Sequence, residues 1–307
     1  MSDISNLMEK RQLWIEALAG QDPSSIQNQL REASWKLAVW QLLLEAEAIS
    51  PVENDILKSF VFGCFVDSQL LSVRRLGEAG GDKPAKLSGR NEVFSLPALL
   101  NDIKNNIKLL TRKNLFKVEG LTYDIDMLHV QRQEFISNQM AAGKVNPCAT
   151  TDFHDVQRRH EQIDELAGLT EAERSPTDCI KEDTLAELID IVKTSTGGFA
   201  IYANKFIAHA ATPDSRKTNH PLLHEFNFDL KKFLKTHTNL CKVAIFINNI
   251  LLNRRDPLTF PLLDSLETLH IPLVAQSDVP ALEIKWNSLR SGYRNLKTWE
   301  ITELLPR

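Results

Sequence analysis

The chain has 307 residues, of which 43% are hydrophobic and 25% charged, and its formal net charge is −4. These values are typical of globular proteins, so we expect a sizeable core, in one large helical domain or two smaller ones. The net charge gives no general attraction to nucleic acid or anionic membranes, so either partner would need a local basic patch. The only glycine doublets are 80–81 and 197–198, which excludes a P-loop or Rossmann fingerprint.

The N-terminus, the apolar runs and the cysteines favour a cytoplasmic protein with no membrane partner. The first residues carry no basic region followed by an apolar run, so we expect no signal peptide. The longest apolar stretch, 243–252, is too short to cross a bilayer. Reduced, mostly buried thiols are predicted because the spacing of the cysteines is unpaired. They are Cys64, Cys148, Cys179 and Cys241.

Helical signals dominate the first part of the chain. Gly20 stops the first helix, and Asp22-Pro23 provides a cap and a first-turn proline for the second. A loop rich in Gly, Lys, Asp and Pro at 79–93 separates the third helix from the fourth. The predicted helices cover about residues 3–19, 23–49, 52–78, 95–110, 124–142 and 152–166. In the third, apolar positions recur mostly at three- and four-residue intervals: Ile56, Phe60, Cys64, Leu70 and Leu71.

The second part continues this pattern and then becomes irregular. A helix after Ser175-Pro176 is expected to end at Thr196-Gly197-Gly198, and a further helix runs from there to Pro213. Residues 226–251 form the strongest apolar stripe of the chain. Beyond Asp256, residues 269–274 and 284–286 could form short strands. The chain is therefore predicted to be an all-α multi-helix bundle, with a helical domain at 1–254 and a C-terminal extension of uncertain structure at 255–307.

The most specific string of the chain lies at residues 201–211, Ile-Tyr-Ala-Asn-Lys-Phe-Ile-Ala-His-Ala-Ala. Lys205 and His209 are four residues apart, so a helix places their side chains next to each other. The alanines around them leave room for another backbone to come close. The string therefore predicts a site that handles phosphate.

Residues 202–209 resemble the signature of the HEPN superfamily, which is often written Arg-Asn-Lys-x-x-Ala-His. Two further segments resemble the abortive-infection branch of bacterial HEPN proteins. The first, 65–76, contains the double arginine Arg74-Arg75, and the second is 94–103 followed by 110–112. The likeness spans about residues 55–209 and implies an all-α HEPN-like core at about 55–254.

The resemblance implies a metal-independent ribonuclease of a bacterial defence or toxin–antitoxin system. His209 would be the general acid or base, with Asn204 and Lys205 beside it. Active members work as dimers, so the implied partners are a second copy, RNA or a nucleotide, and an antitoxin. No cofactor and no metal are implied.

The chain departs from the signature at position 203, where alanine replaces the arginine that precedes Asn204. Alanine removes the planar guanidinium that suits phosphate. Three outcomes stay open. Lys205 supplies the charge, or Arg74 or Arg75 reaches the site as a phosphate-binding residue, or cleavage is lost and the site only binds.

A structural interpretation competes with the functional one. His209 and Asn204 would then be hydrogen-bonded groups that lock helices together, and Asp67 would form a buried ion pair or amide network with Arg74. The alternative function is a non-catalytic helical scaffold or dimerisation protein that keeps the HEPN hairpin only for its structure.

The remaining polar residues favour ordinary structural roles. His220 and His224 have metal-ligand spacing but no evident third ligand, and Pro221 indicates a turn, so they are interpreted as loop histidines. His237 lies within the apolar stripe and is expected in the core. Three lysines beside the stripe are interpreted as its solvated flank: Lys231, Lys232 and Lys235. His154 and His160, six residues apart, are expected to face different sides of a helix and receive little weight.

Overall fold

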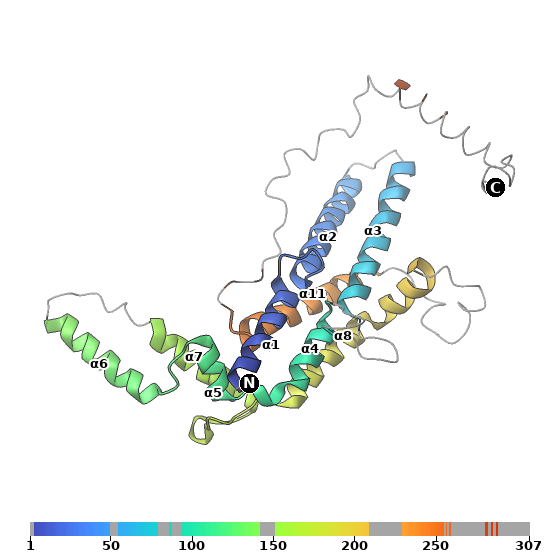
Figure 1. Cartoon of the computed structure of the whole chain (residues 1–307). Coiled ribbons are helices and arrows are strands. Elements are labelled where there is room, and N and C mark those ends of the chain that lie inside the picture. Colours follow the sequence, from blue (N-terminus) through green and yellow to red (C-terminus); the bar gives the residue numbers. More distant parts are fainter. Residues whose placement is uncertain are drawn as a thin grey trace, which may run out of the picture. The chain divides into compact units, whose positions relative to one another are not determined.

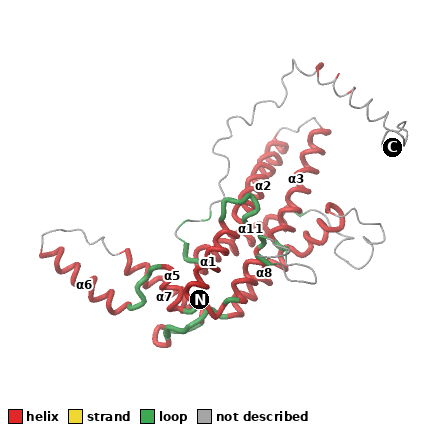
Figure 2. Tube along the Cα trace, viewed as in Figure 1, coloured by secondary structure: helices red, strands yellow, loops and turns green. Residues whose placement is uncertain are grey.

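The computed structural model describes residues 3–49, 55–78, 86–87, 94–141, 151–208, 229–254, 256, 258, 280, 281, 284 and 287. The regular structure of these residues is helical throughout, so the all-α prediction is confirmed for the described chain (Figure 2). Contacts divide the chain into two units, Met1–Leu262 and Leu263–Arg307. In the second unit the described residues, including Ile284, are helical, so the short strand expected at 284–286 is wrong at that residue. Residues 269–274 lie outside the described residues.

Figure 1 shows the helices of the first unit. The described helices are α1 (Asp3–Ala19), α2 (Ile26–Ile49), α3 (Asp55–Leu76), α4 (Leu96–Asn105), α5 (Arg112–Glu119), α6 (Ile125–Ala141), α7 (Thr151–Ala167), α8 (Glu182–Tyr202) and α11 (Leu230–Phe246). Short 3-10 turns lie at η1 (Ile107–Leu109) and η2 (Glu171–Glu173). Two π-helical segments, η3 (Ala203–Ala208) and η4 (Ile247–Leu251), continue α8 and α11.

Local capping explains several boundaries. Ser95 accepts a hydrogen bond from the backbone N–H of Ala98 (3.2 Å) at the start of α4, and Asp229 accepts from the N–H of Lys231 (2.9 Å) at the start of α11. Gly120, at φ 69°, ends α5 in the left-handed conformation that glycine tolerates. The sequence does not predict α5, because its eight residues contain no full apolar period.

Helix α8 is longer than predicted, because it continues through Gly197-Gly198 to Tyr202. Each glycine inside a helix costs about 1 kcal/mol relative to alanine. Phe199, directly after the doublet, is 1% exposed and stacks edge to face on Phe233 of α11, at a centroid distance of 5.5 Å. Burial of a phenylalanine contributes about 2–3 kcal/mol, which offsets the cost of the two glycines.

Helix α8 lies at the centre of the first unit, where it packs against α3, α4 and α11. Helix α1 packs against α2, α4 and α5. The indole N–H of Trp14 donates to Oδ2 of Asp102 (2.7 Å), and the ammonium of Lys10 lies 3.1 Å from Oδ1 of the same carboxylate. This polar contact fixes α1 on α4 at the edge of a core that includes Leu18, Leu99 and many other buried side chains.

The solvent-facing side of α3 differs from the prediction. Phe60 is 67% exposed and Cys64 is also exposed, whereas the buried side chains of α3 include Phe65, Leu70 and Val73. The predicted stripe is therefore confirmed at Leu70 and wrong at Phe60 and Cys64, because α3 packs on α2 and α8 through the face that carries Phe65, Leu70 and Val73. The described cysteines are free thiols, as predicted, but Cys64 is exposed and Cys179 and Cys241 are only half-buried. Among the described helices, none has the length and apolar character that a membrane span requires.

Candidate phosphate-binding site

The motif at residues 201–211 begins where the α-helix α8 gives way to a π-helix. Ile201 and Tyr202 end the α-helix, and the backbone of Ala203–Ala208 forms the π-helix η3. Single π turns inside α-helices are rare and are often found at functional sites. His209 lies outside the described residues, as does the side chain of Lys205. The pairing of these two side chains therefore stays a prediction.

Position 203 is part of the core. Ala203 is 0% exposed and belongs to the cluster of buried apolar side chains. An arginine at this position would bring its long side chain and charge into that cluster, where burial of an unpaired charge is very costly. Packing therefore explains why the residue is small, and a guanidinium at this site has to come from another element.

Helix α3 is the element that faces the motif. Gly77, directly after α3, lies against the side chain of Thr196 in α8, and α3 also packs on η3. Gly77 lies beyond the C-terminal end of α3 and is level with Thr196, so the contacts with η3 come from residues earlier in α3. Since η3 follows Thr196 in the chain, α3 and α8 run in opposite directions. Helical side chains lean towards the N-terminus of their own helix. The Cα–Cβ bond of Arg74 therefore tilts along α3 in the direction of η3, and that of Asn204 tilts along its helix in the direction of Thr196.

The two side chains share an unusual property. Nε of Arg74 and Oδ1 of Asn204 are buried and have no hydrogen-bond partner among the described residues, although both side chains are only half-buried. A buried polar atom without a partner costs about 1–3 kcal/mol. One atom is a donor and the other an acceptor, and they lie on elements that pack together. This pair is the strongest sign of a site within the motif region.

The other candidates of α3 are placed differently. Arg75 is exposed, so Arg74 is the better placed of the two arginines for a contact with η3. Asp67 is also exposed. The buried ion pair or network that we expected for Asp67 is therefore wrong, because this side of α3 faces solvent.

No protein-family model, curated protein or solved structure matches the chain. The HEPN resemblance therefore rests on the quoted residues and stays a prediction.

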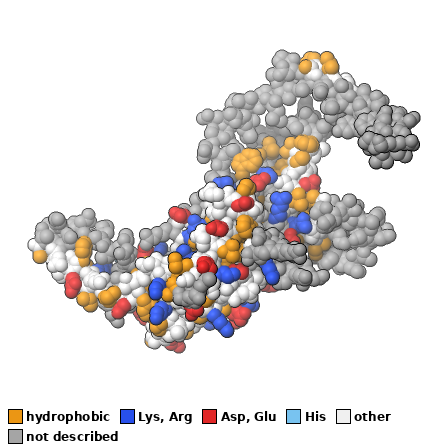
Figure 3. Space-filling model, viewed as in Figure 1, with side chains coloured by type: hydrophobic (Ala, Val, Ile, Leu, Met, Phe, Trp, Pro, Cys, Tyr) orange, Lys and Arg blue, Asp and Glu red, His pale blue; other side chains and the backbone are white. Residues whose placement is uncertain are grey.

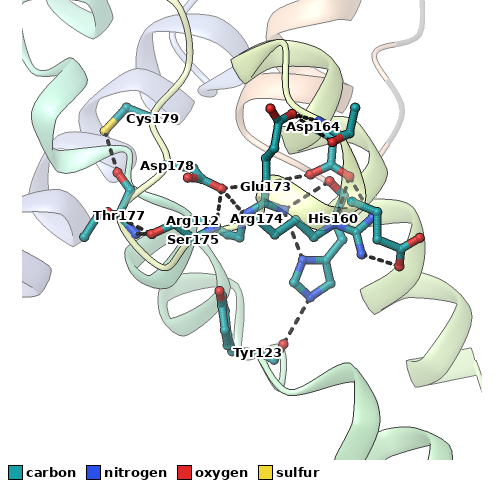
Figure 4. Close-up of polar contacts among 12 residues, drawn as sticks. Arg112, Tyr123, His160, Asp164, Glu173, Arg174, Ser175, Thr177, Asp178 and Cys179 are labelled. Carbon is teal, nitrogen blue, oxygen red and sulfur yellow. Dashed lines mark hydrogen bonds and ion pairs between the residues drawn. The ribbon is translucent and has the colours of Figure 1, made fainter.

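A second polar cluster, which the sequence analysis missed, surrounds Arg112 at the start of α5 (Figure 4). Its guanidinium is 0% exposed and donates to Asp164 (2.6 Å), to Asp178 (3.0 Å) and to the ring nitrogen Nδ1 of His160 (3.1 Å). Arg174 donates to the other oxygen of Asp164 from two nitrogens, at 2.9 and 2.6 Å. Because all three donor nitrogens of Arg112 are used, this cluster fastens α5 to α7 and the 174–179 loop and offers no free group to a ligand.

The contacts of His160 define its tautomer. Since Arg112 can only donate, Nδ1 accepts, and Nε2 carries the proton that it donates to the carbonyl of Tyr123 (3.1 Å). Burial lowers the pKa of His160, and the nearby Arg112 and Arg174 lower it further. His160 is therefore a neutral structural residue. The spacing of His154 and His160 could not reveal this structural role, because the partner Arg112 lies 48 residues away in the sequence.

His237 is buried in the core, as predicted, at 8% exposure. Its Nε2 lies 2.8 Å from Oγ of Ser34 and 3.5 Å from Sγ of Cys241. Burial lowers the pKa of His237 to about 4 and raises that of Cys241 to about 11. Both shifts oppose catalysis, since a neutral thiol is a poor nucleophile and an imidazole with so low a pKa is a weak base.

The remaining candidates add no ligand site. Lys231, Lys232 and Lys235 are exposed, in agreement with a solvated flank. His220 and His224 lie outside the described residues. Within the described ranges, no group of three His, Cys, Asp or Glu side chains could hold a metal ion.

Proposed function

We propose that the chain is a HEPN-like protein of a bacterial defence or toxin–antitoxin system that binds RNA between α3 and η3. Arg74 supplies the guanidinium that the motif lacks at position 203. The observation that carries the proposal is the complementary pair of partnerless atoms, Nε of Arg74 and Oδ1 of Asn204. A phosphate oxygen can accept from the first, and a ribose 2′-hydroxyl can donate to the second.

This pairing favours RNA over DNA. DNA has the phosphate but lacks the 2′-hydroxyl that would satisfy Asn204. Because both atoms are buried, the two half-exposed side chains have to turn outward as RNA enters. Cleavage, where it occurs, needs no metal: His209 takes the proton of a 2′-hydroxyl, whose oxygen attacks the adjacent phosphorus to form a 2′,3′-cyclic phosphate. The bond to the 5′-oxygen breaks, this oxygen takes the proton back from the imidazolium, and Arg74 stabilises the charge that develops on the phosphate.

The two adjacent arginines allow a matched test. Arg74→Ala and Arg75→Ala each remove one positive charge from the same turn of α3. We expect Arg74→Ala to weaken the binding of a labelled single-stranded RNA by about tenfold or more, since a charge-assisted hydrogen bond contributes about 1.5–3 kcal/mol. Arg75→Ala should change it by less than about threefold.

Asn204 tests the preference for RNA. Asn204→Ala should reduce RNA binding to the level of DNA of the same sequence and leave DNA binding unchanged. His209→Ala should abolish cleavage and keep binding. Equal RNA affinity of Arg74→Ala and Arg75→Ala, measured by fluorescence anisotropy on folded variants, would contradict the proposal.

A second candidate function is a scaffold that associates with another copy of itself. One observation favours it: a groove of about 400 Å³ between α2 and α3, lined mainly by apolar side chains. Trp35 at its edge is 40% exposed, Leu43 is 36% exposed and Phe60 is 67% exposed. Figure 3 shows hydrophobic side chains gathered over the ends of these two helices. Exposed apolar patches of this kind are typical of protein interfaces.

Light scattering tests the scaffold function. A dimer that uses this groove should become monomeric when Phe60→Asp places a charge in it, whereas Met140→Asp, at a 76% exposed site on α6, should keep the mass of the parent. A monomeric parent would contradict the scaffold function, whereas RNA binding between α3 and η3 needs only one copy of the chain.

A further inference from the structure

A pocket of about 300 Å³ lies away from the motif, between α1, α5, α7 and the residues that follow η4. Its lining includes Arg11 of α1, Glu119 of α5 and Arg254. The volume is at the lower end of the range for small-molecule sites in proteins. All of these residues belong to the first unit of the chain.

The described lining of the pocket holds three arginines and three carboxylates, and these carboxylates differ in the partners that they already have. Glu119 is held by Arg159, whose Nε and Nη2 donate to its two oxygens at 2.9 and 2.6 Å. Both of these side chains are almost fully buried, at 4% and 1% exposure. The charge of Glu119 is therefore balanced by Arg159. The guanidinium groups of Arg11 and Arg254 also line the pocket.

Of these two arginines, Arg11 has the weaker interaction with a counter-charge. Its Nη2 donates to the carbonyl of Leu252 (2.7 Å), and the described residues provide no other hydrogen bond to its guanidinium. Burial lowers the pKa of Arg11, while Glu119 opposes that shift and the charges of Arg159 and Arg254 add to it. A bound anion would stabilise the charged form of Arg11, because this partly buried cation is repelled by two other arginines.

Arg254 is held in place by the end of η4. Asn253 adopts the left-handed conformation at φ 43°, which asparagine tolerates at a helix end, and donates to Glu119 (2.7 Å). The backbone N–H of Arg254 then donates back to the carbonyl of Asn248 (2.9 Å). The carboxylate nearest to its guanidinium, Asp256, is 3.6 Å away and 89% exposed, so it neutralises Arg254 only weakly.

We propose that this pocket binds a phosphate monoester, with Arg11 and Arg254 donating to the phosphate oxygens. Two guanidinium groups in a pocket of this size match a dianion that accepts several hydrogen bonds. Two other lining residues balance each other, since Arg158 is 3.2 Å from Asp155, so Arg11 and Arg254 are the cations left for a ligand. The site is independent of Arg74 and Asn204, and its existence does not require RNA binding by the motif.

Calorimetry on the full chain can test this proposal. We expect AMP to bind, inorganic phosphate to bind more weakly and adenosine not to bind. An RNA with a 5′-phosphate, compared with the same RNA without it, shows whether the phosphate can also come from a nucleic acid end. Arg254→Gln and Arg11→Gln should each weaken AMP binding by about tenfold or more.

Lys117→Gln is the matched control, because it removes one positive charge from an exposed position of α5. It should leave AMP binding unchanged. If Arg11→Gln does not fold, Arg11→Lys keeps the charge but loses the planar fork and should still bind more weakly. Equal binding of adenosine and AMP, or unchanged affinity in the folded arginine variants, would overturn the proposal. Unchanged AMP binding by Arg74→Ala would confirm that the two sites are separate.

Discussion

Arg112 and Asp164 form an ion pair, with Nη2 of the guanidinium 2.6 Å from Oδ1 of the carboxylate and no part of the arginine side chain exposed to solvent. Arg112 begins α5 and Asp164 lies near the end of α7, so the pair connects two helices that are far apart in the sequence. Burial raises the pKa of Asp164, but the hydrogen bonds from Arg174 and Arg112 outweigh it and hold the pKa below its usual value. The carboxylate is therefore charged at neutral pH and serves two arginines.

Asp164→Asn should strongly destabilise the protein. The amide leaves the fully enclosed Arg112 with Asp178 as its remaining carboxylate partner and removes the carboxylate that Arg174 binds, and breaking a buried pair in this way costs up to about 3–5 kcal/mol. The free energy of unfolding in urea measures the loss. Arg158→Gln is the control, because Arg158 is 57% exposed in its pair with Asp155, and such surface pairs contribute at most about 1 kcal/mol. Equal losses in the two variants would show that the enclosed pair has no special role.

Stability should fall between pH 6.5 and about 4. The pKa of His237 is lowered to about 4 by burial, so in this interval the unfolded chain binds a proton that the native chain does not. Its contribution is complete above the unfolded pKa of about 6.5 and is lost as the pH falls to the folded value. A shift of this size corresponds to about 3 kcal/mol. His160, whose pKa is also lowered, acts in the same direction.

Urea unfolding at pH 7 and pH 4.5 measures this dependence. His237→Gln should be less stable than the parent at pH 7 and should lose less stability on acidification, because glutamine does not titrate. His129→Gln, at an exposed position of α6, should keep the steeper dependence of the parent. A parent whose stability is flat over this interval would contradict the assigned burial of His237.

The sequence predicted the helices better than it predicted the polar clusters. Caps and helix-breaking residues are local signals, so the bounds of α1 and the end of α2 could be deduced from the sequence, whereas α2 begins at Ile26 and not at Pro23. The apolar stripe likewise gave the core position of His237. Contacts between distant residues leave no local pattern. Arg112 meets His160 48 residues away, and Arg11 meets Leu252 at a separation of 241. The Gly197-Gly198 doublet misled the prediction because tertiary packing of Phe199 outweighs helix propensity.

Two glycines near α3 should respond to alanine with opposite signs. A Cβ at Gly77 would overlap the side chain of Thr196, with Cβ at 2.7 Å and Cγ2 at 2.8 Å, whereas a Cβ at Gly63 would meet nothing within 4 Å. Gly77→Ala should therefore cost about 1–3 kcal/mol through overpacking between α3 and α8. Gly63→Ala, within the helix, should stabilise by up to about 1 kcal/mol through helix propensity. Thermal melts of the two variants measure both effects.

A double variant tests the cause of the loss at Gly77. Adding Thr196→Ala to Gly77→Ala should recover part of the stability, because Oγ1 and Cγ2 of Thr196 are removed. Equal melting temperatures for Gly77→Ala and the parent would contradict the close approach of α3 to α8. The proposed contact of Arg74 with the motif depends on this approach.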